Sequence, residues 1–340
     1  MKRLKTLSNN PNKQTLIVFL LISIAIFFIV SLNTGVTHLS LINGLNDWLH
    51  STRSIDSLIL YEIRLPRTLL AIIIGASLGI SGAALQGMLR NPLAEPGVIG
   101  VSASAALGAV IVFYFGLSSI FPLALPLGGI TGALLAVILL HLLAGKNSSI
   151  LTLILAGVAI SSLSAALTAL ALNLAPNPFA SLEIFFWLMG SLSDRSFLHV
   201  WLILPTTLIG WWLMLSVRRG LDALSLGEDT ATSMGVNVQS LNKRIILGVA
   251  LSVGAAVSVS GGIGFIGLIV PHLLRPYVHH KPGRLLIVSG LAGALLLLLA
   301  DIAVRLLPTQ QELKIGVLTA LIGAPFFLHL LLKSRREWAL

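Results

Sequence analysis

Residues 64–100 read RLPRTLLAIIIGASLGISGAALQGMLRNPLAEPGVIG. Two arginines begin the stretch, about twenty residues rich in Gly, Ala and Ser follow, and a polar Asn-Pro-Leu-Ala-Glu-Pro-Gly turn comes next. Small residues let helix backbones approach closely, and Gly75 and Gly79 form a GxxxG pair. A helix that faces only lipid has no need of them. The stretch therefore predicts one wall of a polytopic helix bundle that ends in a structured loop.

The composition places the whole chain in a bilayer. Of its 340 residues, 56% are hydrophobic and 10% are charged, whereas a soluble domain carries about 25% charge. The chain has no Cys, which excludes a disulfide framework, a thiol nucleophile and a Cys-based metal site. The net charge of +10 does not indicate nucleic acid, because the basic residues lie in short loops and do not cluster with aromatic residues.

A bilayer core needs about 20 apolar residues per helix. We expect an all-α membrane protein of about ten spans, forming a single transmembrane domain over residues 1–340. The eighth of these spans is short and rich in Gly. The expected spans cover roughly residues 15–34, 67–89, 97–116, 120–144, 150–173, 196–217, 243–259, 263–278, 284–306 and 313–333.

The distribution of Lys and Arg predicts the orientation. With ten spans, sixteen of the 22 lie in the two termini and the even-numbered loops, and six lie on the opposite side. Positive residues concentrate on the cytoplasmic side. Both termini are therefore expected in the cytoplasm.

The sequence lacks the common catalytic motifs. It contains no Walker A loop, HExxH or GxSxG, and its His residues show no metal-ligand spacing. Asp301 is the exception to a near absence of acidic residues within spans, and it can pair with Arg305 at i,i+4. We expect no catalytic residue, metal or cofactor. If the chain transports a substrate, the energy would come from another chain, because this one has neither a nucleotide site nor a buried group that could couple transport to an ion gradient. An intramembrane enzyme acting on lipid or peptide is the remote alternative.

The polar segment 218–242 predicts two short helices separated by Gly227. Glu228 stands where the second helix would start, which suits the helix dipole. A solvated connection is one interpretation. A docking element for a cytoplasmic partner is favoured, because a simple tether needs no broken pair of helical turns.

Seven motifs carry a family resemblance: RLPR at 64–67, SGAALQG at 81–87, NPLAEPGVIGVS at 91–102, LSLGEDTATSMG at 224–235, GGIGFIGLIVPHLLR at 261–275, ADIAVR at 300–305 and ELKIGVLTALIGAPFF at 312–327. In this order they resemble the permease subunit of type II ABC importers, the family that takes up vitamin B12 and iron chelates, including siderophores and heme.

The resemblance implies a homodimer in the bacterial inner membrane with its pathway at the dimer axis. Two cytoplasmic ATP-binding subunits would dock on the 218–242 loop, through Leu224, Gly227, Glu228, Ala231 and Gly235. A periplasmic substrate-binding protein would place acidic residues on Arg64, Arg67 and Arg305. Interfacial snorkelling is the alternative for the first two arginines, and pairing with Asp301 is the alternative for the third.

The resemblance also places the pathway along the fifth span. Its small and mildly polar residues would line the pathway or simply serve helix packing: Gly157, Ser161, Ser162, Ser164 and Ala165. The preceding loop, with Asn147, Ser148 and Ser149, matches the position of the family's cytoplasmic gate. The segment FWLMGSLSDRS at 186–196 is more similar to iron-chelate members than to vitamin B12 members, so an iron chelate is the expected substrate and vitamin B12 the alternative.

Overall fold

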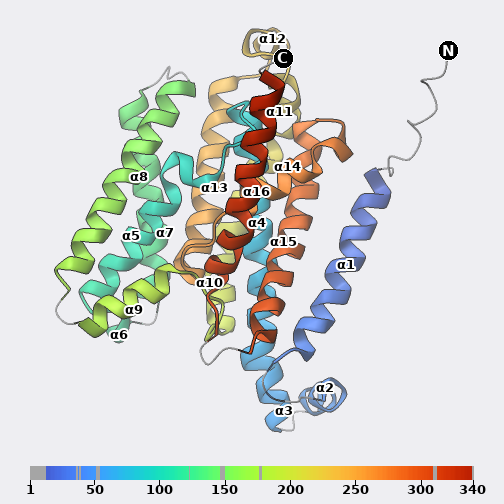
Figure 1. Ribbon diagram of the computed structural model, residues 1–340, viewed down its shortest axis with the longest axis vertical. Coiled ribbons are helices and arrows are strands. Elements are labelled where there is room, and N and C mark those ends of the chain that lie inside the picture. The colour runs from blue at the N-terminus through green and yellow to red at the C-terminus, as the bar shows by residue number, and fades with distance from the viewer. Residues whose placement is uncertain are drawn as a thin grey trace.

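A computed structural model describes residues 13–35, 37, 40–50, 54–121, 123–145, 150–175, 178–308 and 312–338. Within these ranges the chain contains helices and no strand (Figure 1). The longer helices are α1 (Lys13–Asn33), α4 (Leu65–Met88), α5 (Val101–Tyr114), α7 (Ala124–Ala144), α8 (Ile150–Asn173), α10 (Phe197–Ser216), α13 (Val238–Ser260), α15 (Pro282–Leu306) and α16 (Ile315–Trp338). The shorter elements are α2 (Leu41–Leu49), α3 (Ile55–Leu58), the π-helical η1 (Ile59–Arg64), η2 (Pro96–Ile99), α6 (Leu117–Ile120), α9 (Pro178–Leu188), α11 (Arg218–Leu224), α12 (Glu228–Ser233), α14 (Ile266–Leu274) and η3 (Pro276–Val278).

The all-helical membrane class is confirmed. Among the described residues, seven helical runs are long and apolar enough to cross a membrane: 55–88, which ends in α4, together with α1, α7, α8, α10, α13 and α15. Shorter apolar helices cover 101–114, 178–188 and 315–330. Length and composition thus identify seven helices that are able to cross a membrane, and they do not establish the number ten.

Helix α4 forms the centre of the bundle, and its small residues allow the close packing that the sequence predicts. A Cβ atom at Gly75 would lie 2.3 Å from the carbonyl oxygen of Gly293 on α15. At Gly79 it would lie 2.0 Å from the carbonyl oxygen of Ser289, also on α15. These distances leave no room for a side chain, so α4 and α15 meet backbone to backbone.

The expected eighth span, residues 263–278, is much shorter in the structure. Helix α14 has nine residues and begins after Phe265, whose φ of 65° is left-handed. Gly82 on α4 approaches so closely that a Cβ there would lie 1.9 Å from the Gly267 carbonyl oxygen. The glycine-rich segment 261–265 is therefore non-helical, and it is the first turn of α14 that packs closely against α4.

The two ends of the molecule carry different elements (Figure 1). The start of α1, the end of α16, and α11 and α12 lie at one end, here named the α12 end. Helices α2, α3 and α9 lie at the other, here named the α2 end. If the chain crosses the membrane an even number of times, its first helix must begin on the same side on which its last helix ends. The start of α1 and the end of α16 meet this requirement.

Candidate functional site

Three arginines predicted to meet a binding protein surround one cavity at the α2 end. Arg64 comes from η1, Arg67 from the first turn of α4, and Arg305 from the last turn of α15. Together with Glu312 they line a cavity of about 420 Å³. The side chains are mostly buried, with residue exposures of 4% for Arg64 and 8% for Arg67. A snorkelling arginine extends its guanidinium out to the membrane interface, whereas Arg64 and Arg67 place theirs inside the protein.

Asp301 joins two of these arginines inside the protein. Its carboxylate accepts a hydrogen bond of 2.8 Å from Arg67 Nε and one of 2.5 Å from Arg305 Nη2. Asp301 has no exposed surface. The i,i+4 pairing of Asp301 with Arg305 is confirmed, and the same carboxylate also holds α4 against α15. An uncompensated charge here would be costly, and the positive charges of Arg67 and Arg305 are matched by the two carboxylates of Asp301 and Glu312.

Arg64 and Arg305 also bind the carboxyl-terminal end of α1. Arg64 Nη1 donates to the Leu32 carbonyl over 2.8 Å, and Arg305 Nη1 donates to the carbonyls of Ser31 at 2.9 Å and Thr34 at 3.1 Å. The last carbonyls of a helix lack intrahelical donors, and cations are favourable at this end of the dipole. The arginines therefore attach α1 to the bundle through its free carbonyl groups.

Glu312 is a site residue that our sequence interpretation missed. Its two carboxylate oxygens accept hydrogen bonds from the two terminal nitrogens of Arg67, and one of them accepts a third from Ser193 Oγ at 3.0 Å. Partial burial raises the pKa of the Glu312 carboxyl, but the hydrogen bonds and charge of Arg67 outweigh this, and the net pKa is lowered. The sequence offered one indication of its importance, its place as the first residue of the ELKIGV motif. That motif does not indicate which residue Glu312 would pair with.

The 218–242 segment contains the two predicted short helices, α11 and α12. Gly227 joins them with a φ of 113°, which favours glycine. Gly235 ends α12 with a φ of 83°; its N–H binds the Thr232 carbonyl, and the next N–H, of Val236, binds the Ala231 carbonyl. This pair of bonds is a Schellman motif. Helix α13 already begins at Val238, within the predicted loop 218–242, whose boundary stays a prediction.

This pair of helices, here named the coupling unit, is fixed to the bundle on one side and open on the other. Asp222 Oδ1 accepts a 2.8 Å hydrogen bond from the N–H of Gly283 at the start of α15. Leu224 and Ala231 are buried, whereas Glu228 is exposed. The open side carries two apolar side chains that we did not predict, Leu226 (65% exposed) and Met234 (62% exposed).

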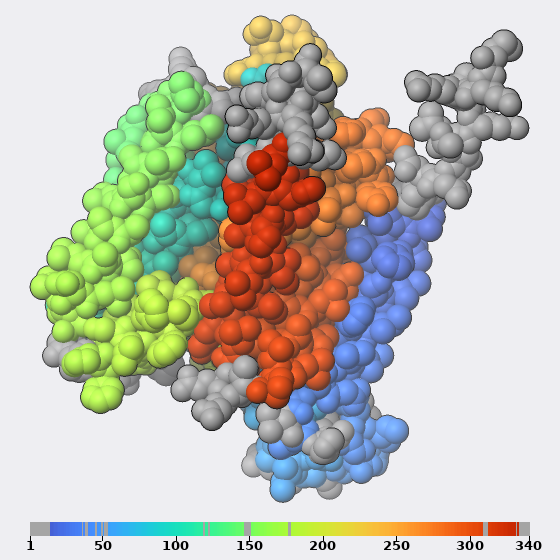
Figure 2. All heavy atoms as spheres, in the orientation of Figure 1, coloured from blue at the N-terminus to red at the C-terminus, as the bar shows by residue number. Residues whose placement is uncertain are grey.

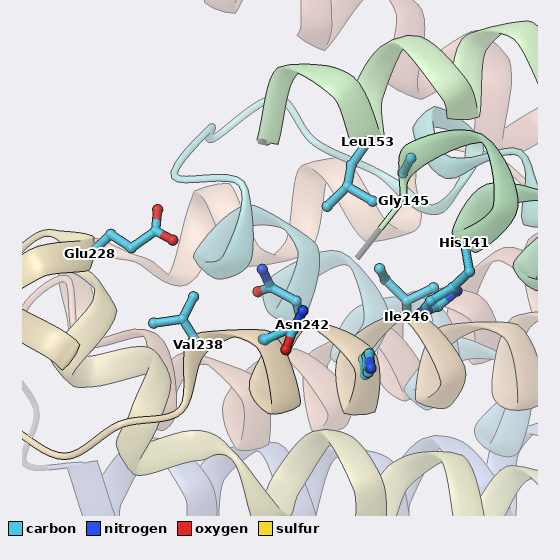
Figure 3. A pocket seen from close by; sticks show the side chains of 10 residues that line it. His141, Gly145, Leu153, Glu228, Val238, Asn242 and Ile246 are labelled. Atoms are coloured by element: carbon cyan, nitrogen blue, oxygen red, sulfur yellow. The ribbon is translucent and has the colours of Figure 1, made fainter. Parts of the chain in front are cut away.

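A cavity of about 340 Å³ lies between the coupling unit and the ends of α7, α8 and α13. In Figure 3, Glu228 and Val238 lie on one side of it, and Leu153, Gly145 and His141 lie on the other. The predicted gate residues Asn147, Ser148 and Ser149 lie outside the described residues. Their neighbours at the end of α7 and in the first turn of α8 line this cavity, which places the coupling unit beside the two helices that flank the predicted gate.

The five predicted pathway residues point in two directions from α8. A Cβ at Gly157 would lie 2.2 Å from the Val98 carbonyl oxygen. Ser161 Oγ donates a 3.0 Å hydrogen bond to the Gly97 carbonyl. Ser164 is buried, and its Oγ lies 2.8 Å from the Oγ of a serine on α5. These three residues serve packing within the chain. Ser162 and Ala165 are exposed, and a role in lining a pathway stays a prediction for them. Figure 2 shows the molecule hollowed between α8 and α16.

No group of three or more His, Cys, Asp or Glu side chains suited to a metal ion occurs in the part of the chain that the structure describes.

Comparison with known proteins gives the family. The model of the FecCD transport family matches residues 21–333. The chain belongs to this family. It is 33% identical to the Bacillus subtilis iron(3+)-hydroxamate import system permease protein FhuG, over 97% of this chain and 100% of that protein. It is 41% identical to the vitamin B12 import system permease protein BtuC of Vibrio cholerae, over 83% of this chain and 85% of that protein.

A solved structure of the same kind has a TM-score of 0.84 and 34% sequence identity to this FecCD-family chain, covering 95% of it and 100% of the solved chain. It is an inward-facing conformation assigned to a metal-chelate type ABC transporter. The FecCD-family chain is thus the permease subunit of a type II ABC importer, for which ATP-binding partner subunits are expected.

Proposed function

We propose that two copies of this chain form the membrane pathway of an importer that carries an iron chelate from the periplasm to the cytoplasm. ATP would be hydrolysed by two partner subunits at the α12 end, and a periplasmic binding protein would deliver the chelate at the α2 end. The observation that supports the proposal is that the coupling unit and the arginine cavity, which would suit two different partners, lie at opposite ends of one bundle.

The coupling unit has the properties of a rigid contact for a soluble partner. Its helices are fixed by Asp222 and by the Schellman motif at Gly235. Its open side combines an acidic helix start at Glu228 with the exposed Leu226 and Met234. Interfaces bury apolar anchors within a polar rim, and this surface offers both.

The arginine cavity supports docking of an acidic partner. Arg67 and Arg305 bind carboxylates of this chain, whereas no ion pair to Arg64 occurs among the described residues. Arg64 is held by the carbonyls of Leu32 and Thr37, so its positive charge lines the cavity without a paired carboxylate, and an incoming carboxylate would neutralise it. Charge complementarity of this kind fixes register and raises the association rate.

The orientation follows from the sequence and from the relative positions of the terminal helices. The side predicted to be richer in Lys and Arg includes the residues next to the start of α1, the end of α16 and the coupling unit, and these three elements lie together at the α12 end. We therefore propose that the α12 end faces the cytoplasm, with the chain in the inner membrane of a bacterium and surrounded by lipid.

The substrate proposal rests on FWLMGSLSDRS at 186–196, which is more similar to iron-chelate members. Vitamin B12 is the second candidate, because a vitamin B12 permease shares 41% identity. The test is uptake by a bacterial strain that lacks its own iron-chelate and vitamin B12 permeases and expresses this chain with its ATPase and binding protein. We expect uptake of a radiolabelled ferric chelate. Uptake of cobalamin alone would assign the second candidate, and uptake of neither would reject both.

A further inference from the structure

We propose that Glu312 is an internal occupant of the arginine cavity, which a carboxylate of the binding protein displaces, and that this exchange releases the start of α16. The inference rests on the proposed docking function of the cavity. It adds to that function a competitor within this chain, Glu312. It also connects docking at the arginine cavity with α16, which borders the hollow seen in Figure 2.

The two carboxylates bound by Arg67 differ in accessibility. The side chain of Asp301 is fully buried, whereas that of Glu312 is 35% exposed. Arg67 uses Nε and Nη2 toward Asp301, and it presents both terminal nitrogens, Nη1 and Nη2, to Glu312. A two-pronged contact with the terminal nitrogens is the arrangement that any incoming carboxylate would seek. Glu312 is thus the exchangeable partner and Asp301 the permanent one.

Exchange avoids the main cost of breaking a buried ion pair. Removing one partner leaves the other as an uncompensated charge, which is strongly unfavourable. Here one carboxylate replaces another on Arg67, so the guanidinium is neutralised before and after docking. The released Glu312 turns to water from a position that is already partly exposed.

Glu312 is also one of the few attachments at the start of α16. It lies three residues before Ile315, which is 1% exposed, and it is bound by Ser193 from the segment between α9 and α10. A Cβ at Gly316 would lie 2.2 Å from the Met189 carbonyl oxygen, so the first turn of α16 is tightly seated.

Beyond this first turn, one face of α16 still packs on the bundle, because a Cβ at Gly323 would lie 2.2 Å from the Phe265 ring and Phe326 contacts His272, while the other face is open. Leu321 and Leu328 are 65% and 60% exposed, and a cavity of 560 Å³ lies against Ala320 and its neighbours. Loss of the Arg67–Glu312 contact therefore removes one of the attachments that hold the segment leading into α16.

Binding affinity tests the exchange. The cognate binding protein is titrated against the complete importer in lipid nanodiscs, with wild type, Glu312→Gln and the matched control Glu183→Gln, an exposed carboxylate on α9 at the same end. Removing the internal competitor should tighten binding by about tenfold, equivalent to about 1.4 kcal/mol. The control should leave binding within about twofold of wild type. Ser193→Ala, which removes one hydrogen bond and no charge, should tighten it by a smaller factor and serves if Glu312→Gln does not fold.

Failure of this inference and failure of docking are distinguishable. If Arg64→Gln and Arg67→Gln weaken binding while Glu312→Gln leaves it unchanged or weakens it, docking stands and Glu312 is no competitor. If neither arginine variant changes binding, the docking proposal itself is wrong.

The release of α16 has its own readout. The chain has no Cys, so Ala320→Cys provides a single labelling site on α16, at the wall of the 560 Å³ cavity. Binding protein should accelerate its reaction with a maleimide in the wild-type background, and Glu312→Gln should give the fast rate without binding protein. An equal, slow rate in both backgrounds would overturn the link to α16.

Discussion

At the scale of single residues, Asp301 is the residue that joins two arginines of the cavity, Arg67 on α4 and Arg305 on α15. It is fully buried between two guanidinium groups, so Asp301→Ala leaves both cations without their shared anion. We expect a loss of about 3–5 kcal/mol in stability. The measurement is the denaturation midpoint of the detergent-solubilised protein, with Glu183→Gln as a control for loss of an exposed carboxylate. An unchanged midpoint for Asp301→Ala would mean that the network does not hold α4 to α15.

Glu312 predicts a pH dependence of stability. Its pKa in the folded protein is lowered from the ordinary value of 4.5, chiefly because Arg67 outweighs the opposing effect of burial. A lowered carboxylate pKa contributes stability that is fully present above the ordinary value and is lost as the pH falls through the folded value.

Acidification from neutral pH to 4.5 should therefore leave this contribution intact, and further acidification should remove it. The measurement compares melting temperatures of wild type and Glu312→Gln across this range. Their difference should be constant above pH 4.5 and shrink below it. A difference that grows on acidification would contradict the assignment.

The sequence could predict short-range contacts at this scale but not long-range ones. Asp301 and Arg305 are four residues apart on one helix, and helix geometry alone brings them together. Arg67 and Glu312 are 245 residues apart, and their contact depends on how α4, α15 and the segment before α16 pack. No local pattern contains that information.

At the scale of elements, the coupling unit depends on Gly227. Its φ of 113° is inaccessible to proline, whose ring fixes φ near −65°. Gly227→Pro should displace α12 and abolish co-purification of the ATPase while the chain still inserts into the membrane. Glu228→Arg should also weaken the association, because it reverses an exposed charge at the start of α12. Normal co-purification with both variants would show that the ATPase docks elsewhere.

The α4–α15 contact makes a second prediction at this scale. A Cβ at Gly79 would lie 2.0 Å from a backbone oxygen of Ser289, so Gly79→Ala forces the helices apart. Overpacking of this kind costs about 1–3 kcal/mol. Gly264→Ala is the matched control, since no atom lies within 4 Å of a Cβ there. Thermal unfolding should separate the two variants, and equal midpoints would show that the contact yields easily.

Helix positions were predicted well where the apolar run was long and capped by polar residues. The expected span 150–173 coincides with α8, and 196–217 differs from α10 by one residue at each end. The prediction failed at 263–278 because apolar composition does not distinguish a helix from the non-helical, glycine-rich chain that precedes α14. It also missed the early start of α13, where the side chain of Asn237 accepts a 2.8 Å hydrogen bond from the Ser240 N–H.

At the scale of the whole molecule, the proposed dimer places α8 near its counterpart. Helix α1 lies on the opposite side of the molecule (Figure 1). Because the chain has no Cys, single substitutions report on proximity directly. Ala165→Cys, on the exposed face of α8, should form a disulfide between two copies under mild oxidation, and Ile22→Cys, on the exposed face of α1, should not. The reverse pattern would require a different dimer axis.

The central claim is that this chain forms the pathway while other chains provide energy and select the substrate. The most direct test is uptake of a ferric chelate into proteoliposomes that contain this chain, with its ATPase and binding protein added or omitted one at a time. We predict ATP-dependent uptake only with all three proteins, and no ATP hydrolysis by the purified chain alone. Undiminished uptake without the ATPase, or ATP turnover by the isolated chain, would contradict the account.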